Sequence, residues 1–313
     1  MLIVIIRGLA VSTGSRCSYN DFFQELVQLV SKHKALEEVL KLCKTEYVSV
    51  LKFLVKECVR VGCMECEQNI INPTNSALQN PLWTLCKDML KKVQVIPAEI
   101  FDVLFSHLLP AEKEGNLGSF HAVQLFIKEN LLSLECEVSK MIMISLENLY
   151  VPSLEMCSTH MSHILKELYA VIPSTISKFL PLLVPKLKDE KPRTRQIGVL
   201  LVGRMFASSS YNLSVDMPHL WSTYLQRFSD QNEVIREECL KFLPTTLIHH
   251  PELRRDLTGV LARRLFDPHY LVRIAAIKAF ASVAQKKPDC LDPEVIEAAY
   301  IMTEALQVFY VSL

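Results

Sequence analysis

Hydrophobic side chains return every three or four positions through most of this chain, with polar residues between them. That period is typical of amphipathic helices, which bury one stripe and expose the other. It predicts a first helix capped by Asn20, with one apolar stripe made of Phe22, Phe23, Leu26, Val27 and Val30. Further helices are expected at residues 36–42, 48–61, 82–93, 100–109, 120–131, 138–149 and 157–171. The polar stretch from Gly62 to Pro81 holds two prolines and is expected to be a loop.

After residue 174 the helices are predicted to come in pairs, each pair forming one unit. The three units are Ile176–Leu187 with Arg193–Phe206, Leu220–Phe228 with Val234–Ile248, and Leu253–Leu265 with Leu271–Ala284. Prolines recur in expected first turns, where a helix tolerates them, at Pro192, Pro218, Pro251, Pro268 and Pro293. Asp267 and Asp292, each directly before a proline, are expected to be N-caps.

An aspartate followed six residues later by an arginine marks each of the three units. The pairs are Asp189 with Arg195, Asp230 with Arg236, and Asp267 with Arg273. They lie 41 and then 37 residues apart, and a period of roughly 40 residues with two helices per unit indicates a HEAT-type repeat. The predicted fold is therefore all-α, a HEAT/armadillo-type helical solenoid (an α-α superhelix), which serves as an extended binding surface.

The repeated pairs are interpreted as structural rather than as binding or catalytic residues. Each aspartate closes the turn between two helices, where its side chain can accept backbone N–H groups. Each arginine falls near the start of the second helix, from which its planar guanidinium can reach the aspartate of a neighbouring unit. The six residues would then form a ladder that fixes the register of the repeats.

The composition favours a helical scaffold and excludes several other classes. Half of the residues are hydrophobic, only eight are glycine, and the formal net charge is zero. No glycine-rich phosphate-binding motif is present, and the balanced charge gives no global attraction to nucleic acid or membrane. The apolar start, Met1–Ile6, is too short for a secretory signal or a membrane span, so the ten cysteines are expected to be free thiols. Five of them are expected to fill the core: Cys43, Cys86, Cys136, Cys157 and Cys239.

These patterns predict four regions along the chain. A poorly defined tail is expected at residues 1–20, followed by degenerate helical repeats at 21–99 with a loop near 62–81. HEAT repeats are expected at residues 100–290, and a truncated last helix or tail at 291–313.

Two groups of residues have the side-chain types that bind metal ions. Cys63 and Cys66 form a CxxC motif with no second CxxC at finger-like spacing. Cys157, His160 and His163 lie on one predicted helix, but the first and last point about 120° apart, which suits chelation poorly. Packed thiols and exposed histidines are the simpler interpretation. We expect no metal, no cofactor, no small-molecule substrate and no enzymatic activity, because every catalytic motif is missing.

The last predicted unit carries an uneven charge. Between Arg254 and Lys287 the net charge is +6, whereas it is −4 between Glu112 and Glu155. One hypothesis is a basic surface that contacts a partner, formed by Arg254, Arg255, Arg263, Arg264, Lys286 and Lys287. The alternative is a solvated helix surface, which is favoured because Arg254 and Arg263 lie about half a turn out of phase.

Three segments resemble one known family. They are LLPAEKEGNLGSFHAVQLFIKEN at 108–130, FLPLLVPKLKDEKPRTRQIGVLLVGRMFA at 179–207, and LWSTYLQRFSDQNEVIREECLKFLPTTLIHHP at 220–251. The last is closest, and it continues as ELRRDLTGVLARRLFDPHYLVRIAAI. These segments are similar to the precocious-dissociation-of-sisters proteins, regulators associated with cohesin. The resemblance is specific between about residues 100 and 285.

The resemblance implies a nuclear, non-enzymatic scaffold that regulates sister-chromatid cohesion in the cell cycle. Its implied partners are the kleisin subunit of cohesin and the cohesin release and maintenance factors, with indirect association with chromatin. Family members are several times longer, so the chain would be a fragment or a reduced version. The family's peptide-receiving Ala-Pro motif has no match here, and no family site residue carries over to a numbered position. The alternative is a generic HEAT-repeat adaptor, such as a transport or phosphatase scaffold, that binds an unrelated protein.

Overall fold

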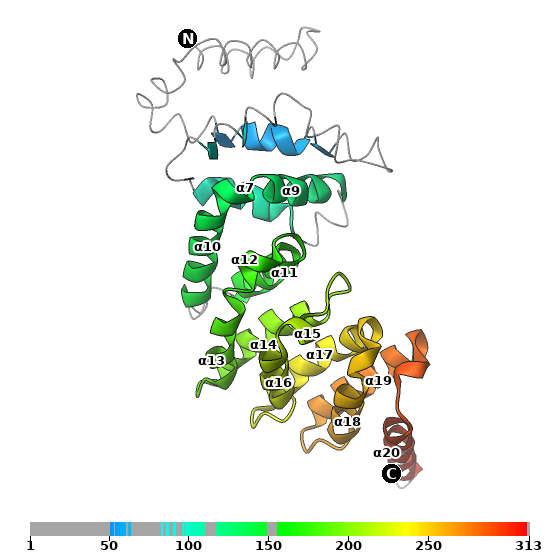
Figure 1. Ribbon diagram of the computed structural model, residues 1–313. Coiled ribbons are helices and arrows are strands. Elements are labelled where there is room, and N and C mark those ends of the chain that lie inside the picture. Colours follow the sequence, from blue (N-terminus) through cyan, green and yellow to red (C-terminus); the bar gives the residue numbers. More distant parts are fainter. Residues whose placement is uncertain are drawn as a thin grey trace, which may run out of the picture. The chain divides into compact units, whose positions relative to one another are not determined.

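The computed structural model of this protein describes residues 51–52, 54–60, 62–63, 83, 86–87, 90–91, 96, 98–109, 117–148 and 155–311. Every regular element in these ranges is a helix (Figure 1). The prediction of an all-α chain is therefore confirmed for the described residues. The predicted tail at 1–20 and the helix capped by Asn20 lie outside them. Most of the loop predicted at 62–81 also lies outside, although Gly62 and Cys63 are helical.

Two compact units make up the chain. Unit 1 comprises Met1–His107 and Ala111–Leu134, and unit 2 comprises Leu108–Pro110 and Glu135–Leu313. In unit 1, helices α7 (Ala98–Ser106) and α9 (Leu117–Glu129) are described in full. Trp83 anchors the core of unit 1, because its ring meets Phe126 edge-on at 5.5 Å and its Nε1 donates to the Cys58 carbonyl at 3.1 Å. Helix α10 (Leu131–Asn148) begins in unit 1 and ends in unit 2.

Unit 2 is a series of helices joined by short turns. Its α-helices after α10 are α11 (Glu155–Val171), α12 (Pro173–Ile176), α13 (Leu183–Lys188), α14 (Pro192–Phe206), α15 (Leu213–Asp216), α16 (Pro218–Arg227), α17 (Glu233–His249), α18 (Arg254–Leu265), α19 (Tyr270–Lys286) and α20 (Pro293–Val311). Short 3-10 turns occur at Leu180–Leu182, Pro251–Leu253 and Pro288–Cys290. No helix in the described ranges is both long enough and apolar enough to cross a membrane.

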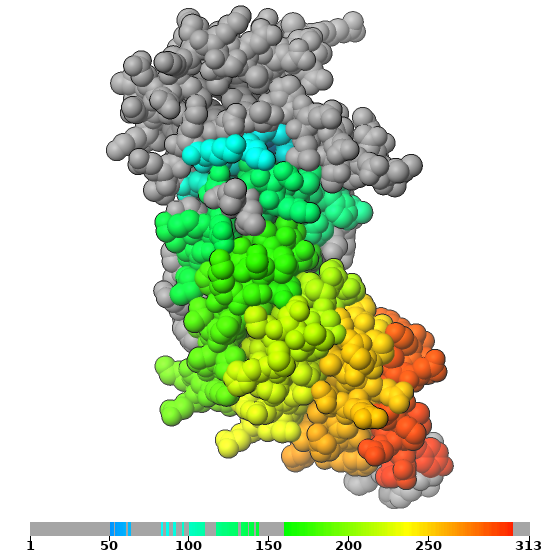
Figure 2. Space-filling model, in the orientation of Figure 1, coloured from blue at the N-terminus to red at the C-terminus, as the bar shows by residue number. Residues whose placement is uncertain are grey.

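The helices of unit 2 form two layers. In one layer α14 packs between α11 and α17, and α17 packs in turn against α19. In the other, α13 packs on α16, and α18 packs on α20. The surface of unit 2 accordingly shows successive bands in sequence order, from green to red (Figure 2). Each pair contacts mainly its neighbours, as expected for a stacked repeat.

The first helix of the first predicted unit is broken, which corrects the prediction of one helix at Ile176–Leu187. It is replaced by α12, the 3-10 turn at Leu180–Leu182, and the six-residue α13. Pro181 explains the break, because it has no backbone N–H to donate to the preceding turn, whereas Pro185 lies within α13. The other five predicted helices of the three units are present, with ends that differ by a few residues.

The predicted N-cap at Asp267 is wrong. Helix α19 begins at Tyr270, its N-cap is His269, and Pro268 lies before the helix rather than in its first turn. The Asp267 side chain instead accepts the backbone N–H of His269 at 3.0 Å, closing the turn. Asp292 does lie directly before α20, but its carboxylate contacts Arg254 and Thr258. The prolines at 192 and 218 occupy first turns as predicted.

The cysteine prediction is confirmed at two positions and wrong at one. Cys86 and Cys239 are fully buried, as expected of thiols that pack in a core. Cys136 is exposed on α10, so its apolar neighbours in the sequence did not place it inside. The side chains of Cys43 and Cys157 lie outside the described part.

An aromatic cluster and a glycine hold the first two predicted repeat units together. Phe206 contacts the rings of Trp221 at 4.8 Å and Tyr224 at 5.3 Å, and Tyr224 is fully buried. Gly203 on α14 lies directly under the ring of Phe242 on α17. A Cβ atom at position 203 would meet Cδ2 of Phe242 at 2.5 Å, so only glycine allows this approach of the two helices.

Candidate interaction surfaces

Two arginines join consecutive helix-pair repeats of the solenoid through buried aspartates. Arg195 donates from Nε and Nη2 to the two carboxylate oxygens of Asp230, each at 2.8 Å. Arg236 contacts Asp267 in the same way, at 2.9 Å and 2.7 Å. The Asp230 and Asp267 side chains are 1% and 0% exposed, so both ion pairs are shielded from water. These bidentate pairs are the strongest kind of protein hydrogen bond.

Each arginine also binds the turn of its own unit. Nη1 of Arg195 donates to the carbonyls of Asp189 and Glu190 at 2.8 Å and 2.9 Å. Nη1 of Arg236 donates to the carbonyls of Asp230 and Gln231 at 2.8 Å and 3.1 Å. One guanidinium therefore fixes its own turn to the next turn, which sets the register between units.

The aspartates of the ladder are held in their charged form. Burial alone would raise the pKa of Asp230, but hydrogen bonds from Arg195 and the Asn232 N–H, with the charges of Arg195 and Arg227, lower it. The pKa of Asp267 is lowered in the same way: hydrogen bonds from Arg236 and the His269 N–H, with nearby arginine charge, outweigh burial. Arg227 and Arg264 complete the two clusters, at 2.7 Å and 2.6 Å from the carboxylates.

The two ends of the ladder differ from its middle. Arg273 donates to the carbonyls of Asp267 and Pro268 at 2.8 Å and 3.0 Å. Among the residues that the structure describes, no carboxylate pairs with Arg273 and no arginine of a preceding unit pairs with Asp189. Asp189 accepts the N–H of Lys191 at 2.8 Å, so it closes its turn as the other two aspartates do.

The six residues of the hypothetical basic surface lie in three places. Arg263 and Arg264 lie at the end of α18, whereas Arg254 and Arg255 lie at its start. Lys286 and Lys287 lie at the end of α19, which packs against α18.

Three of the six residues make contacts within the chain. Arg254 pairs with Asp292 at 2.6 Å, and Lys287 donates to the Ile248 carbonyl at 3.1 Å. The third is Arg264, which pairs with the buried Asp267. These contacts leave three of the six residues for a partner: Arg255, Arg263 and Lys286.

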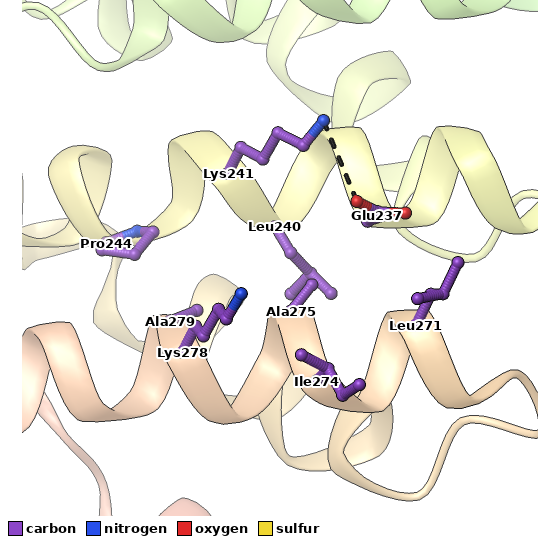
Figure 3. A pocket seen from close by; sticks show the side chains of 9 residues that line it. All are labelled: Glu237, Leu240, Lys241, Pro244, Leu271, Ile274, Ala275, Lys278 and Ala279. Carbon is purple, nitrogen blue, oxygen red and sulfur yellow. Dashed lines mark ion pairs between the residues drawn. The ribbon is translucent and has the colours of Figure 1, made fainter.

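A groove between α17 and α19 is a concave feature of unit 2 that sequence reasoning missed (Figure 3). Its volume is about 370 Å³, and its lining is mainly apolar. The α17 side contributes Glu237, Leu240, Lys241 and Pro244, and the α19 side contributes Leu271, Ile274, Ala275, Lys278 and Ala279. Leu271 and Ile274 are 41% and 42% exposed, so two large apolar side chains stand at the rim.

Charged groups flank this groove unevenly. Lys241 pairs with Glu238 at 2.9 Å and with Glu237 at 3.9 Å, the latter drawn in Figure 3. Lys278 forms no ion pair with any carboxylate in the described ranges. The groove therefore offers an apolar floor beside one ammonium group that no carboxylate of the described residues pairs with.

Neither candidate metal group lies wholly within the described residues. No group of three potential ligands comes together within the described ranges, and Cys66 and the Cys157 side chain lie outside them. His163 contacts Arg204, whose Nη1 lies 3.4 Å from its Nδ1. Burial and the nearby charges of Arg204 and Lys166 lower the pKa of His163 to about 4.

Comparisons with known proteins agree with the sequence resemblance. The family model for the sister chromatid cohesion protein PDS5 matches residues 63–298. Human PDS5 homologs A and B are each 28% identical to this chain over 217 residues, and zebrafish homolog A is 25% identical over 227 residues. These matches cover 69% of this chain for the human proteins and 72% for the zebrafish protein. The chain spans only 15% to 17% of the length of these relatives.

A solved structure supports the fold. A chain in the structure of the Pds5–Scc1 complex matches with a TM-score of 0.54 over 72% of this chain and 35% of that chain, at 14% identity. At that identity the likeness shows the fold alone, and it confirms the predicted helical solenoid.

Proposed function

This chain belongs to the PDS5 family of sister chromatid cohesion proteins, and on that premise we propose that it is a non-enzymatic scaffold that regulates cohesion by binding cohesin. The family match, which covers residues 63–298, is the observation that carries the proposal. It includes all three helix pairs that the Asp–Arg ladder joins into a stack. Such a stack presents a long surface for protein partners rather than a closed cavity for chemistry.

The proposed partners are the kleisin subunit of cohesin and the factors that release or maintain cohesin on DNA. A solved relative is named for its complex with Scc1, which supports a protein ligand for this fold. We propose a nuclear location and an association with chromosomes that depends on cohesin, because the chain has zero net charge and no global attraction to DNA.

Co-purification with a kleisin subunit tests the proposal. The tagged chain should retain the recombinant kleisin at physiological salt, and in cells it should be recovered with chromatin. Depletion of the kleisin should remove it from chromatin while its total amount is unchanged. Chromatin recovery that persists without the kleisin, or a folded chain that retains no kleisin at low salt, would reject the proposal in favour of an adaptor for another protein.

A further inference from the structure

The groove between α17 and α19 occupies the position where the preceding helix pair holds an aromatic ring. Phe242 lies twelve residues after Asp230, and its ring covers Gly203 of α14. The guanidinium carbon of Arg204 lies 5.8 Å from the ring centre, so Phe242 is enclosed on two sides. This ring fills the space between α14 and α17.

At the next interface, between α17 and α19, the position equivalent to Phe242 holds no aromatic ring. Ala279 lies twelve residues after Asp267 and therefore corresponds to Phe242, while Pro244 of α17 corresponds to Gly203 of α14. Both Ala279 and Pro244 line the groove (Figure 3). The interface that holds Ala279 and Pro244, in place of Phe242 and Gly203, therefore contains a hollow of about 370 Å³ where the preceding interface is filled.

The neighbouring positions on α19 also lack the acidic side chains that α17 carries. Ala275 corresponds to Glu238, and Ile274 corresponds to Glu237, so two acidic positions of α17 are apolar on α19. Lys278 corresponds to Lys241 but has no carboxylate partner among the described residues, whereas Lys241 has two. The α19 side of the groove therefore lacks the aromatic ring and the two acidic side chains that α17 carries at the equivalent positions.

We propose that this groove binds an amphipathic helical segment of another protein through one aromatic side chain, with a carboxylate of that segment pairing with Lys278. The aromatic side chain fills the hollow over Leu240, Ala275 and Ala279, and the exposed Leu271 and Ile274 cover its sides. The inference goes beyond the proposed function, because it assigns a position and a ligand chemistry whether or not the partner is a cohesin subunit. Apolar burial supplies the affinity, and the charge pair supplies the preference for an acidic segment.

Four labelled, alanine-rich helical peptides test the proposal on the intact chain. They carry either phenylalanine or alanine at a central position, and either glutamate or lysine one helical turn away. Fluorescence anisotropy should give the tightest binding for the peptide with phenylalanine and glutamate. Replacing its phenylalanine by alanine should weaken binding about tenfold or more, as expected for one buried aromatic side chain.

Two variants of the chain locate the site. Ala279→Phe supplies the missing ring and should abolish the advantage of the phenylalanine peptides. Lys278→Glu should reverse the preference, so that the peptide with phenylalanine and lysine binds best. Lys188→Glu, a change of charge at an exposed position of α13, is the matched control and should leave all four affinities unchanged.

Three results would overturn the inference. The first is that the peptides bind without any preference for phenylalanine. The second is that the Ala279→Phe variant binds the phenylalanine peptides with the same affinity as the original chain. The third is that the Lys278→Glu variant keeps the original preference for glutamate. If Ala279→Phe fails to fold, as judged by its thermal unfolding, the charge reversal at Lys278 decides alone. A dimer that forms with rising concentration and is abolished by Ala279→Phe would instead identify a second copy as the occupant.

Discussion

Removing Arg236 should destabilise the solenoid far more than removing the equivalent Arg273. Arg236→Met keeps most of the aliphatic stem but deletes two bonds to the fully buried Asp267 and two to turn carbonyls. Loss of one partner from a buried ion pair costs about 3–5 kcal/mol. Asp267 keeps Arg264 and the backbone N–H of His269, so we expect the lower part of that range, about 3 kcal/mol.

Arg273→Met is the matched control, because this residue stands at the same position in the repeat. It is half-buried, it contacts two turn carbonyls, and no carboxylate pairs with it in the described part of the chain. We expect a loss of about 1 kcal/mol, the usual contribution of ordinary hydrogen bonds. Urea unfolding followed by circular dichroism measures both variants. Equal losses at the two positions would refute the claim that the buried carboxylate makes the ladder strong.

A double-mutant cycle isolates the pair itself. Asp267→Asn removes the buried charge, and in that background Arg236→Met should cost clearly less than in the original chain. We expect a coupling energy of about 1.5–3 kcal/mol, typical of contacts within one network. A coupling energy near zero would show that Arg236 acts only through the turn carbonyls.

The same ladder predicts how stability depends on pH. The folded pKa values of Asp230 and Asp267 are lowered from 3.8, so the unfolded chain binds protons more readily than the folded chain at acidic pH. The stabilisation is fully present above the unfolded pKa and is lost as the pH falls below about 4 through the folded pKa values. Asp267→Asn should remove part of this loss, and an unchanged acid profile would contradict the assignment.

Three further outcomes are expected from the helix contacts. Gly203→Ala should lower stability by about 1–3 kcal/mol, measured as a lower urea midpoint, because its methyl group collides with the ring of Phe242; a neutral effect would mean that the ring moves aside freely. Trp221→Phe should cost about 1 kcal/mol by removing the 3.0 Å bond to a carboxylate of α18, and no change in the thermal midpoint would argue against that bond. His163 should remain neutral down to about pH 4 in an NMR titration, and stability should fall as the pH drops from 6.5 toward that value. Arg204→Met should move the pKa of His163 upward, and an unmoved titration would assign the shift to burial alone.

Local sequence was enough to predict the repeat and its register. The spacing between Asp230 and Arg236 located the turn and the second helix, because the aspartate closes the turn and the arginine stands near the start of α17. The helix predicted at Val234–Ile248 is observed as α17, Glu233–His249, with the Asn232 side chain as its N-cap. Proline chemistry could have predicted the break at Pro181, since this residue lacks the N–H that a continuous helix needs.

Contacts between helices could not be predicted from the sequence of one helix alone. Cys136 has apolar neighbours in sequence yet faces solvent, because its place on α10 depends on what covers that helix. The groove was missed because its depth depends on Ala279 facing Pro244 across two helices. Aligning the repeats on their aspartates would have shown Ala279 in place of Phe242, and that comparison is the signal that sequence reasoning left unused.

The most direct test of the central claim is calorimetric titration of the purified chain with a purified kleisin subunit at physiological salt. The account predicts saturable binding to the folded chain and weaker binding by Arg236→Met at a temperature where that variant is partly unfolded. A fully folded chain that shows no binding to the kleisin at any attainable concentration would contradict the claim that this stack of helix pairs is a cohesin-binding scaffold.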